Sequence, residues 1–77
     1  MNLKDLGSHQ TEIEKSNGVT VFFSYNTPVA AHIPGKGFVK TSEFYSKTTS
    51  KHINQWLKAN GSGNAETVDQ DFINNLV

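Results

Sequence analysis

The middle of the chain, from residue 10 to residue 41, alternates between apolar and polar side chains in short runs. Such alternation is typical of β-strands, in which successive side chains point to opposite faces of a sheet. Asn17-Gly18 and Pro34-Gly35 interrupt the runs and favour tight turns, so the strands are expected to form an antiparallel meander. The runs predict three or four strands, at about residues 10–15, 19–25, 29–33 and 37–41.

The run at residues 19–25 has the clearest strand pattern. It carries apolar residues on both faces, because Phe22 lies on the face opposite to Val19 and Val21. This predicts a strand that is central or partly covered on both sides. The run at residues 10–15 has only Ile13 between charged neighbours, so an edge strand is expected there.

Two further expectations concern residues 1–9 and the third predicted strand, at residues 29–33. Residues 1–9 show little pattern, and Leu3 and Leu6 either form one short helical turn or pack on the sheet. In the third strand, strict alternation places Val29 and Ala31 on the same face.

The second half of the chain has the spacing of amphipathic helices. A first helix is expected at about residues 49–60, with Ile53 and Trp56 on its apolar side and lysines on the opposite side. Gly61 is suited to end this helix, because glycine readily adopts the left-handed conformation that follows a helix C-terminus.

A second helix is expected at about residues 67–76, where Thr67-x-x-Gln70 fits a capping box. The apolar faces of the helices and the sheet must be buried against each other. We therefore predict an α+β fold, in which a small antiparallel sheet of three to four strands packs against two C-terminal helices. Residues 1–77 are expected to form a single domain.

Composition limits the classes of function. The chain has 77 residues with seven lysines, seven carboxylates, no arginine and no cysteine. A net charge of zero argues against a general nucleic-acid binder, and the absence of cysteine excludes disulfides and thiolate metal sites. No apolar run is long enough to cross a membrane and no signal sequence is visible, so a soluble intracellular protein is expected.

The most distinctive chemistry lies at the start of the first predicted helix, where a cluster of four hydroxyl residues is flanked by two lysines. Lysines near a helix N-terminus oppose the helix dipole, and a bound anion would reverse that cost. The alternative is an ordinary N-cap with solvated lysines. The residues are Ser46, Lys47, Thr48, Thr49, Ser50 and Lys51.

Charge and aromatic residues extend this candidate contact site. Five lysines and one acid lie between residues 36 and 58, whereas the last 19 residues hold three acids and no lysine. The basic segment either faces a partner or is neutralised by the acidic one, and Tyr25 and Tyr45 belong either to the core or to a contact surface. The predicted contact residues are Lys36, Lys40, Lys47, Thr48, Thr49, Ser50, Lys51, Lys58 and Tyr45.

Catalysis and metal binding are not expected. His9, His32 and His52 match no metal-ligand spacing, and His52 is expected to be packed at the border of the helix's apolar face. Ser50 or Thr49 could only pair with His52 within one helix, without an orienting aspartate or an oxyanion loop. We therefore expect no enzyme, no metal and no cofactor.

A further pattern runs from the strand around Phe23 into the first predicted helix. It consists of Phe23-Ser24-Tyr25, Thr27-Pro28-Val29-Ala30, Thr41, Tyr45-Ser46-Lys47-Thr48-Thr49-Ser50-Lys51-His52-Ile53 and Trp56-Leu57. By this pattern the sequence resembles a family of short tailed-phage proteins of unknown function. The resemblance covers most of residues 19–58 and implies a phage origin and expression in the host bacterial cytoplasm. It brings no activity and no catalytic residues.

These features together favour a non-catalytic binding protein. Short phage proteins of this size often inhibit host proteins, so the expected partner is a host protein or ribonucleoprotein complex of a defence system, such as a CRISPR or restriction effector. The alternative is a small nucleic-acid-binding accessory protein that uses the lysine patch and a stacking tyrosine. A homodimer is a further option, because a core of this size is thin.

Overall fold

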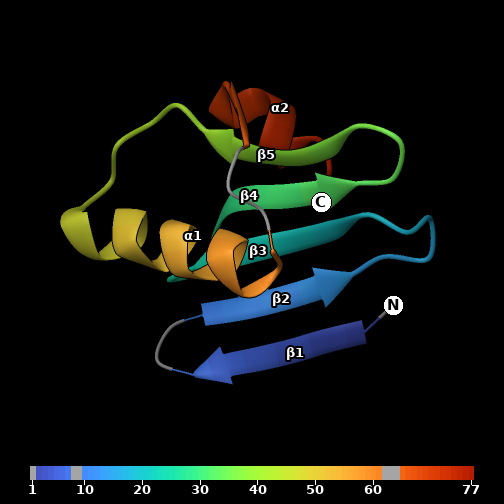
Figure 1. Ribbon diagram of the computed structural model, residues 1–77, viewed down its shortest axis with the longest axis horizontal. Helices are drawn as coiled ribbons and strands as arrows, with labels where there is room; N and C mark the ends of the chain where they lie inside the picture. The colour runs from blue at the N-terminus through green and yellow to red at the C-terminus, as the bar shows by residue number, and fades with distance from the viewer. Residues whose placement is uncertain (1, 8–9, 62–64) are drawn as a thin grey trace.

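A six-stranded sheet, in which the strands lie side by side in chain order, forms the frame of the molecule (Figure 1). The computed structural model describes the backbone of residues 2–7 and all atoms of residues 10–61 and 65–77. The elements are β1 (Asn2–Gly7), β2 (Gln10–Glu14), β3 (Thr20–Ser24), β4 (Thr27–Ile33), β5 (Gly37–Thr41), α1 (Lys47–Ala59), β6 (Glu66–Val68) and α2 (Gln70–Asn74).

The predicted α+β class is confirmed, and the four predicted strands correspond to β2–β5. The predicted antiparallel sheet of three to four strands is too small, because the described sheet has six strands and its β5–β6 pair is parallel. The prediction of an edge strand at residues 10–15 is wrong, because β1 pairs antiparallel with β2 and places Leu3 opposite Ile13. A helical turn at Leu3 and Leu6 is wrong for the same reason. Pairing with a neighbouring strand decides the structure of a segment whose own pattern is weak.

The prediction of a helix at residues 67–76 is wrong over its first part. Residues Glu66–Val68 form β6, which pairs in parallel with β5, and α2 spans only Gln70–Asn74. The predicted capping box is absent, because the Asp69 side chain accepts a 2.8 Å hydrogen bond from the Phe72 N–H and caps α2. The pairing with β6 gives hydrogen-bond partners to backbone N–H and C=O groups of β5 that would be unpaired if β5 were an edge strand.

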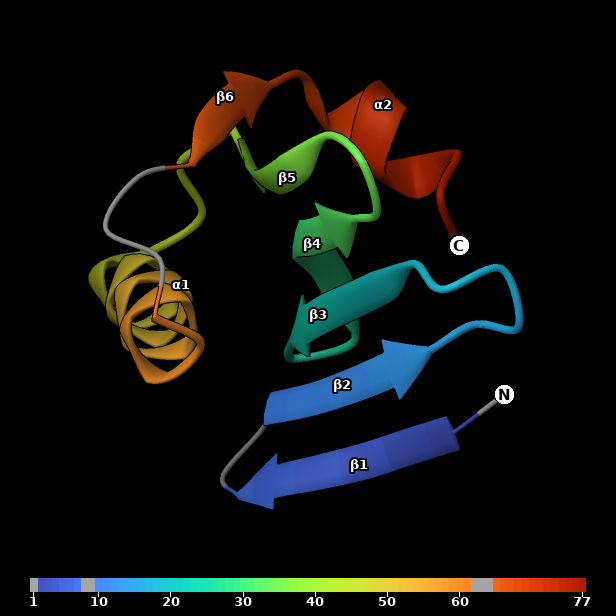
Figure 2. The same ribbon diagram turned by 45° about the vertical axis from the view of Figure 1, so that its right-hand side comes forward.

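The two helices lie on opposite faces of the sheet (Figure 2). On the α1 face, Phe22 packs in one apolar cluster with Trp56 and Leu57. On the α2 face, Val21 belongs to a second cluster that Leu76 joins. Phe22 is fully buried and β3 lies between β2 and β4, so the prediction that this strand is central or partly covered on both sides is confirmed. The two helices, however, do not share one layer.

A β-bulge decides which residues of β4 face α1. The pairing of β3 with β4 shifts between Phe22 and Phe23, which lie opposite Ala30 and Pro28. Val29 is the extra residue, and it joins Phe22 and Ala30 in the cluster under α1. The expectation that Val29 shares a face with Ala31 is therefore wrong, because a bulge interrupts the alternation of side chains.

Candidate functional site

The first helix begins two residues before its predicted start. Ser46 is the N-cap, and its side chain accepts a 3.0 Å hydrogen bond from the Thr49 N–H. The first turn of α1 contains no acidic residue. The serine cap satisfies one of the free N–H groups that a helix start presents, without help from a ligand.

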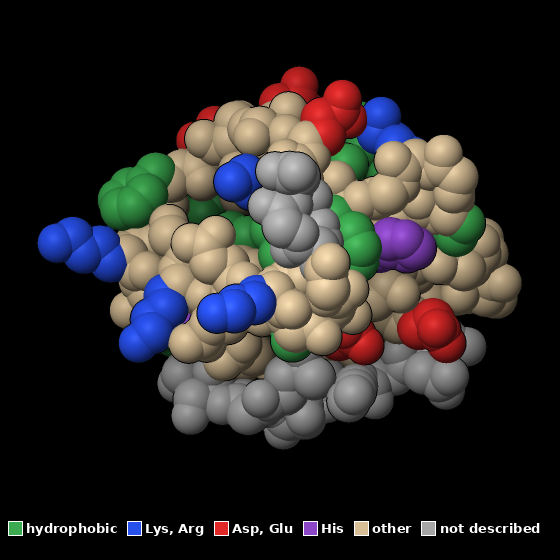
Figure 3. Space-filling model, in the orientation of Figure 1, with side chains coloured by type: hydrophobic (Ala, Val, Ile, Leu, Met, Phe, Trp, Pro, Cys, Tyr) green, Lys and Arg blue, Asp and Glu red, His purple; other side chains and the backbone are tan. Residues whose placement is uncertain are grey.

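Three lysines of α1 form one exposed stripe, which we call the lysine face: Lys47, Lys51 and Lys58. Their spacings of four and seven residues place them on the same side of a helix with 3.6 residues per turn. Among the residues that the structure describes, none of them forms a salt bridge. Figure 3 shows lysine side chains gathered over α1, while carboxylates lie over β6 and α2 and at the lower right.

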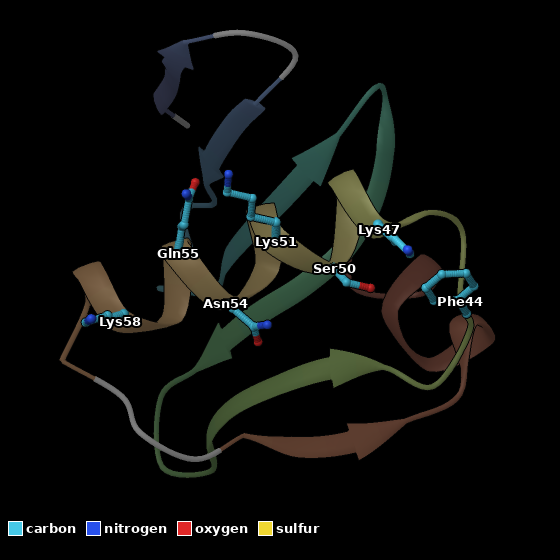
Figure 4. Close-up of a pocket in the computed structure, with 7 residues that line it drawn as sticks. All are labelled: Phe44, Lys47, Ser50, Lys51, Asn54, Gln55 and Lys58. Atoms are coloured by element: carbon cyan, nitrogen blue, oxygen red, sulfur yellow. The ribbon is translucent and has the colours of Figure 1, made fainter.

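The lysine face adjoins a prominent apolar side chain. Phe44 precedes α1 and is 70% exposed, which is the largest exposed fraction among the large hydrophobic side chains described. Together with the lysines and the polar residues of α1, it lines an open hollow of about 490 Å³ (Figure 4). Phe44 was not among the predicted contact residues, although its position after the predicted strand at residues 37–41, between Glu43 and Tyr45, favours exposure.

The other two predicted lysines lie away from this stripe. Lys36 forms a 2.9 Å ion pair with Glu66 and lies 5.8 Å from the centre of the Phe72 ring. Lys40 lines a separate hollow beside Ser50 and Asn54. The structure therefore brings Lys47, Lys51 and Lys58 together, places Lys40 nearby, and pairs Lys36 with the acidic segment.

The hydroxyl residues of the predicted site point in different directions. Thr48 is exposed, and Ser50 lines the hollow next to Phe44. Thr49 is only 5% exposed, and its hydroxyl contacts Ser24 at 3.3 Å and Ser46 at 3.2 Å. Thr49 therefore belongs to the interior, where its hydroxyl already has two partners.

A chain of buried hydrogen bonds links α1 to β3. The Ser46 hydroxyl donates to Thr49 Oγ1, so Thr49 can donate to Ser24 and Ser24 to His52 Nδ1, at 3.0 Å. His52 is 9% exposed and stacks against Tyr25, with 6.0 Å between ring centres. A packed His52 was expected, but the partner Ser24 comes from another element and was not predicted.

The contact between Ser24 and His52 in this hydrogen-bond chain resembles a catalytic nucleophile with its base, but the geometry favours a structural role. Ser24 is only 2% exposed, and its hydroxyl is already engaged with Thr49 and His52. A catalytic serine must present its oxygen to the reacting carbon. We interpret the contact between Ser24 and His52 as a link that fixes α1 on β3.

Replacing Ser24 with alanine should destabilise the protein by about 1–3 kcal/mol, because it leaves the buried Nδ1 of His52 without its partner and removes one of the two partners of the Thr49 hydroxyl. Urea unfolding followed by circular dichroism measures the change. Ser42→Ala removes a hydroxyl from an exposed position and serves as the control. If both variants are equally stable, the buried hydrogen-bond chain through Ser24 does not have the proposed structural role.

Two tyrosines stand at the N-terminal end of α1. Tyr25 and Tyr45 are 48% and 47% exposed, so neither tyrosine belongs to the core. Tyr25 has a φ of 58°, which is unusual for a bulky residue. The two rings line a hollow of about 230 Å³, which we call the tyrosine hollow, with Ser24, Thr27, Val29, Ser46 and Thr49.

The described part of the chain contains neither a cluster of metal-ligating side chains nor a helix that could span a membrane. No three histidine or acidic side chains there are grouped so that they could hold a metal ion. His32 packs against Phe38, with 4.6 Å between ring centres, and His9 lies outside the described residues. Neither described helix combines the length and the apolar character that crossing a bilayer requires.

Comparison with known proteins gives a family and no activity. No curated protein and no solved structure matches the chain. A family model, described as a family of unknown function (DUF8033), matches residues 1–75. That match spans the sheet, both helices, the lysine face and the tyrosine hollow, and the chain therefore belongs to DUF8033.

Proposed function

We propose that this chain is a small phage-encoded binding protein that acts without catalysis in the cytoplasm of a host bacterium. It docks through the lysine face and Phe44 on an acidic surface of a host protein or ribonucleoprotein complex. The partner belongs to a defence system, such as a CRISPR or restriction effector, which the docking inhibits. The observation that carries the docking proposal is a 70% exposed phenylalanine beside three lysines without salt bridges among the described residues.

Burial energy supports Phe44 as the anchor. A 77-residue chain has few large apolar side chains, and leaving one exposed forgoes about 1.5–3 kcal/mol of burial. A partner that covers the Phe44 ring recovers that energy at the interface. Aromatic side chains in the centre of an interface often contribute most of the binding energy.

Charge supports an acidic partner surface. The carboxylates at positions 66, 69 and 71 lie in β6, at the cap of α2 and in α2, away from the lysine face. The lysines on α1 therefore keep their positive field, which speeds the approach of an oppositely charged partner and fixes its orientation. The proposed docking surface combines an apolar anchor at one end with a row of lysines along α1 (Figure 4), and specific protein interfaces likewise combine apolar and charged contacts.

The test is affinity purification of the tagged chain from the bacterial host, together with phage plating on cells that carry an active defence system. We expect Lys47→Gln/Lys51→Gln to reduce the recovered partner by about tenfold or more and to abolish protection of the phage. Ser16→Asp/Asn75→Asp gives the same net charge at exposed positions away from α1 and should retain both.

Two results would overturn the proposal. One is a folded Lys47→Gln/Lys51→Gln variant that keeps every partner and full protection. The other is a wild-type chain that recovers no host component and protects no phage. Phe44→Ala provides an independent check, because it removes the anchor without a change of charge.

A further inference from the structure

The tyrosine hollow has the features of a stacking site. Two aromatic rings from different segments, one after β3 and one before α1, line the same hollow and each remains about half exposed. Single-stranded nucleic acids are bound by such rings, on which bases stack, in combination with cationic side chains that contact the backbone. We propose that the tyrosine hollow binds one unpaired base of a single-stranded nucleic acid, whose neighbouring phosphates contact Lys47 and Lys51.

The ring of Tyr25 is held in place before any ligand binds. Tyr25 and Asn26 have φ values of 58° and 84°, in a tight turn between β3 and β4 that usually selects asparagine or glycine. The ring stacks on His52 at an interplanar angle of 28°, and His52 is fixed by Ser24. A rigid ring loses little conformational entropy on binding, which favours affinity.

The floor of the hollow can contact the edge of a base. The hydroxyls of Ser24 and Thr49 already have partners in the chain of buried hydrogen bonds between α1 and β3. The Ser46 hydroxyl is half-buried, donates to Thr49 Oγ1 and accepts from one backbone N–H, so one of its two lone pairs remains. That lone pair can accept a hydrogen bond from a ring N–H or an amino group of a base. One such contact gives only modest sequence preference.

Local charge fits a phosphate backbone although the net charge of the chain is zero. Lys47 directly follows Ser46, which lines the tyrosine hollow, and Lys51 lies about one turn further along α1. No carboxylate lines the tyrosine hollow or the hollow beside the lysine face within the described residues. Two phosphate contacts predict a shallow dependence on salt, with a slope of about −1.4 in a logarithmic plot for a single strand.

The probe that tests this proposal is a fluorescein-labelled oligothymidylate of about 12 nucleotides, compared with an abasic strand of equal length and charge. Fluorescence anisotropy at about 50 mM salt should show that oligothymidylate binds about tenfold or more tightly than the abasic strand. Tyr45→Ala should weaken binding of oligothymidylate by about tenfold, and Tyr45→Phe should retain it. Phe72→Ala, an exposed aromatic in α2, is the control and should have no effect.

Lysine variants test the backbone contacts separately. Lys47→Gln should reduce the salt slope by about 0.7, whereas Lys36→Gln, which lies beside Glu66, should leave it unchanged. Circular dichroism confirms that each variant is folded.

Three results would overturn the proposal. They are no binding of oligothymidylate up to about 1 mM at low salt, equal binding of the abasic strand, or a folded Tyr45→Ala variant that binds as tightly as the wild type. If Tyr45→Ala instead loses a host protein while oligothymidylate fails to bind, the hollow is a protein contact and the proposal is wrong. Lys58→Gln and Phe44→Ala should affect host-partner recovery alone, so this site and the docking surface can fail independently.

Discussion

Replacing Trp56 with alanine is expected to destabilise the protein by about 3–5 kcal/mol, which is the usual cost of removing a buried tryptophan. Trp56 is 4% exposed and stacks on Phe22, with 5.1 Å between ring centres and an angle of 13°. It also meets the edge of Phe38 at 5.6 Å and donates a 2.8 Å hydrogen bond to Glu12 Oε1. One side chain thus joins α1 to three strands of the sheet.

A 77-residue domain usually has a stability of only a few kcal/mol, so the Trp56→Ala variant should be largely unfolded at room temperature. Urea unfolding followed by circular dichroism is suitable, because it does not depend on tryptophan fluorescence. Trp56→Phe keeps an aromatic ring and removes the N–H, and it should retain the fold with a smaller loss. A loss below about 1 kcal/mol for Trp56→Ala would contradict this account of the core.

The parts of the fold that sequence reasoning predicted are those with strong local patterns. The strand around Phe22 alternates regularly, and Ile53 and Trp56 mark the buried side of α1. Segments with weak patterns depend on their neighbours instead. The Glu66–Val68 segment becomes a strand because β5 offers an edge, and this edge is not visible in the local sequence.

The register of β4 shows a second limit. Residues of β4 alternate in the sequence, yet the bulge opposite Phe22 and Phe23 turns Val29 toward α1. A bulge arises from the pairing of two strands, so a single strand's pattern cannot predict it. The bulge also shapes the tyrosine hollow, because Val29 is one of the residues that line it.

The candidate site was predicted where it depends on helical spacing and missed where it depends on tertiary contacts. Lys47, Lys51 and Lys58 share one exposed face because four- and seven-residue spacings repeat with the helix. Thr49 is turned inward by the same geometry, but its partner Ser24 lies 25 residues earlier in the chain. Only the packing of α1 on β3 brings those two hydroxyls together.

Replacing Ile73 with alanine is expected to destabilise the protein by about 2–5 kcal/mol and to loosen the α2 side of the sheet first. Ile73 is fully buried, although it belongs to a helix of only five residues. Such a short helix is not stable by itself, so its packing on β4 and β5 must supply the stabilisation. Gln70 adds a 2.7 Å hydrogen bond from its Nε2 to the Pro28 carbonyl, which ties the start of α2 to β4.

Hydrogen exchange resolves where the Ile73→Ala variant loses protection, and urea unfolding gives the total loss. The amides of β5 and β6 should exchange faster than those of β3, because α2 covers the β4–β5 side of the sheet while α1 packs on β3. Phe72→Ala is the matched control, since Phe72 is the preceding residue and is 37% exposed. If Phe72→Ala destabilises the protein as much as Ile73→Ala, then the burial of Ile73 does not anchor α2. Other contacts must then hold α2 on its face of the sheet.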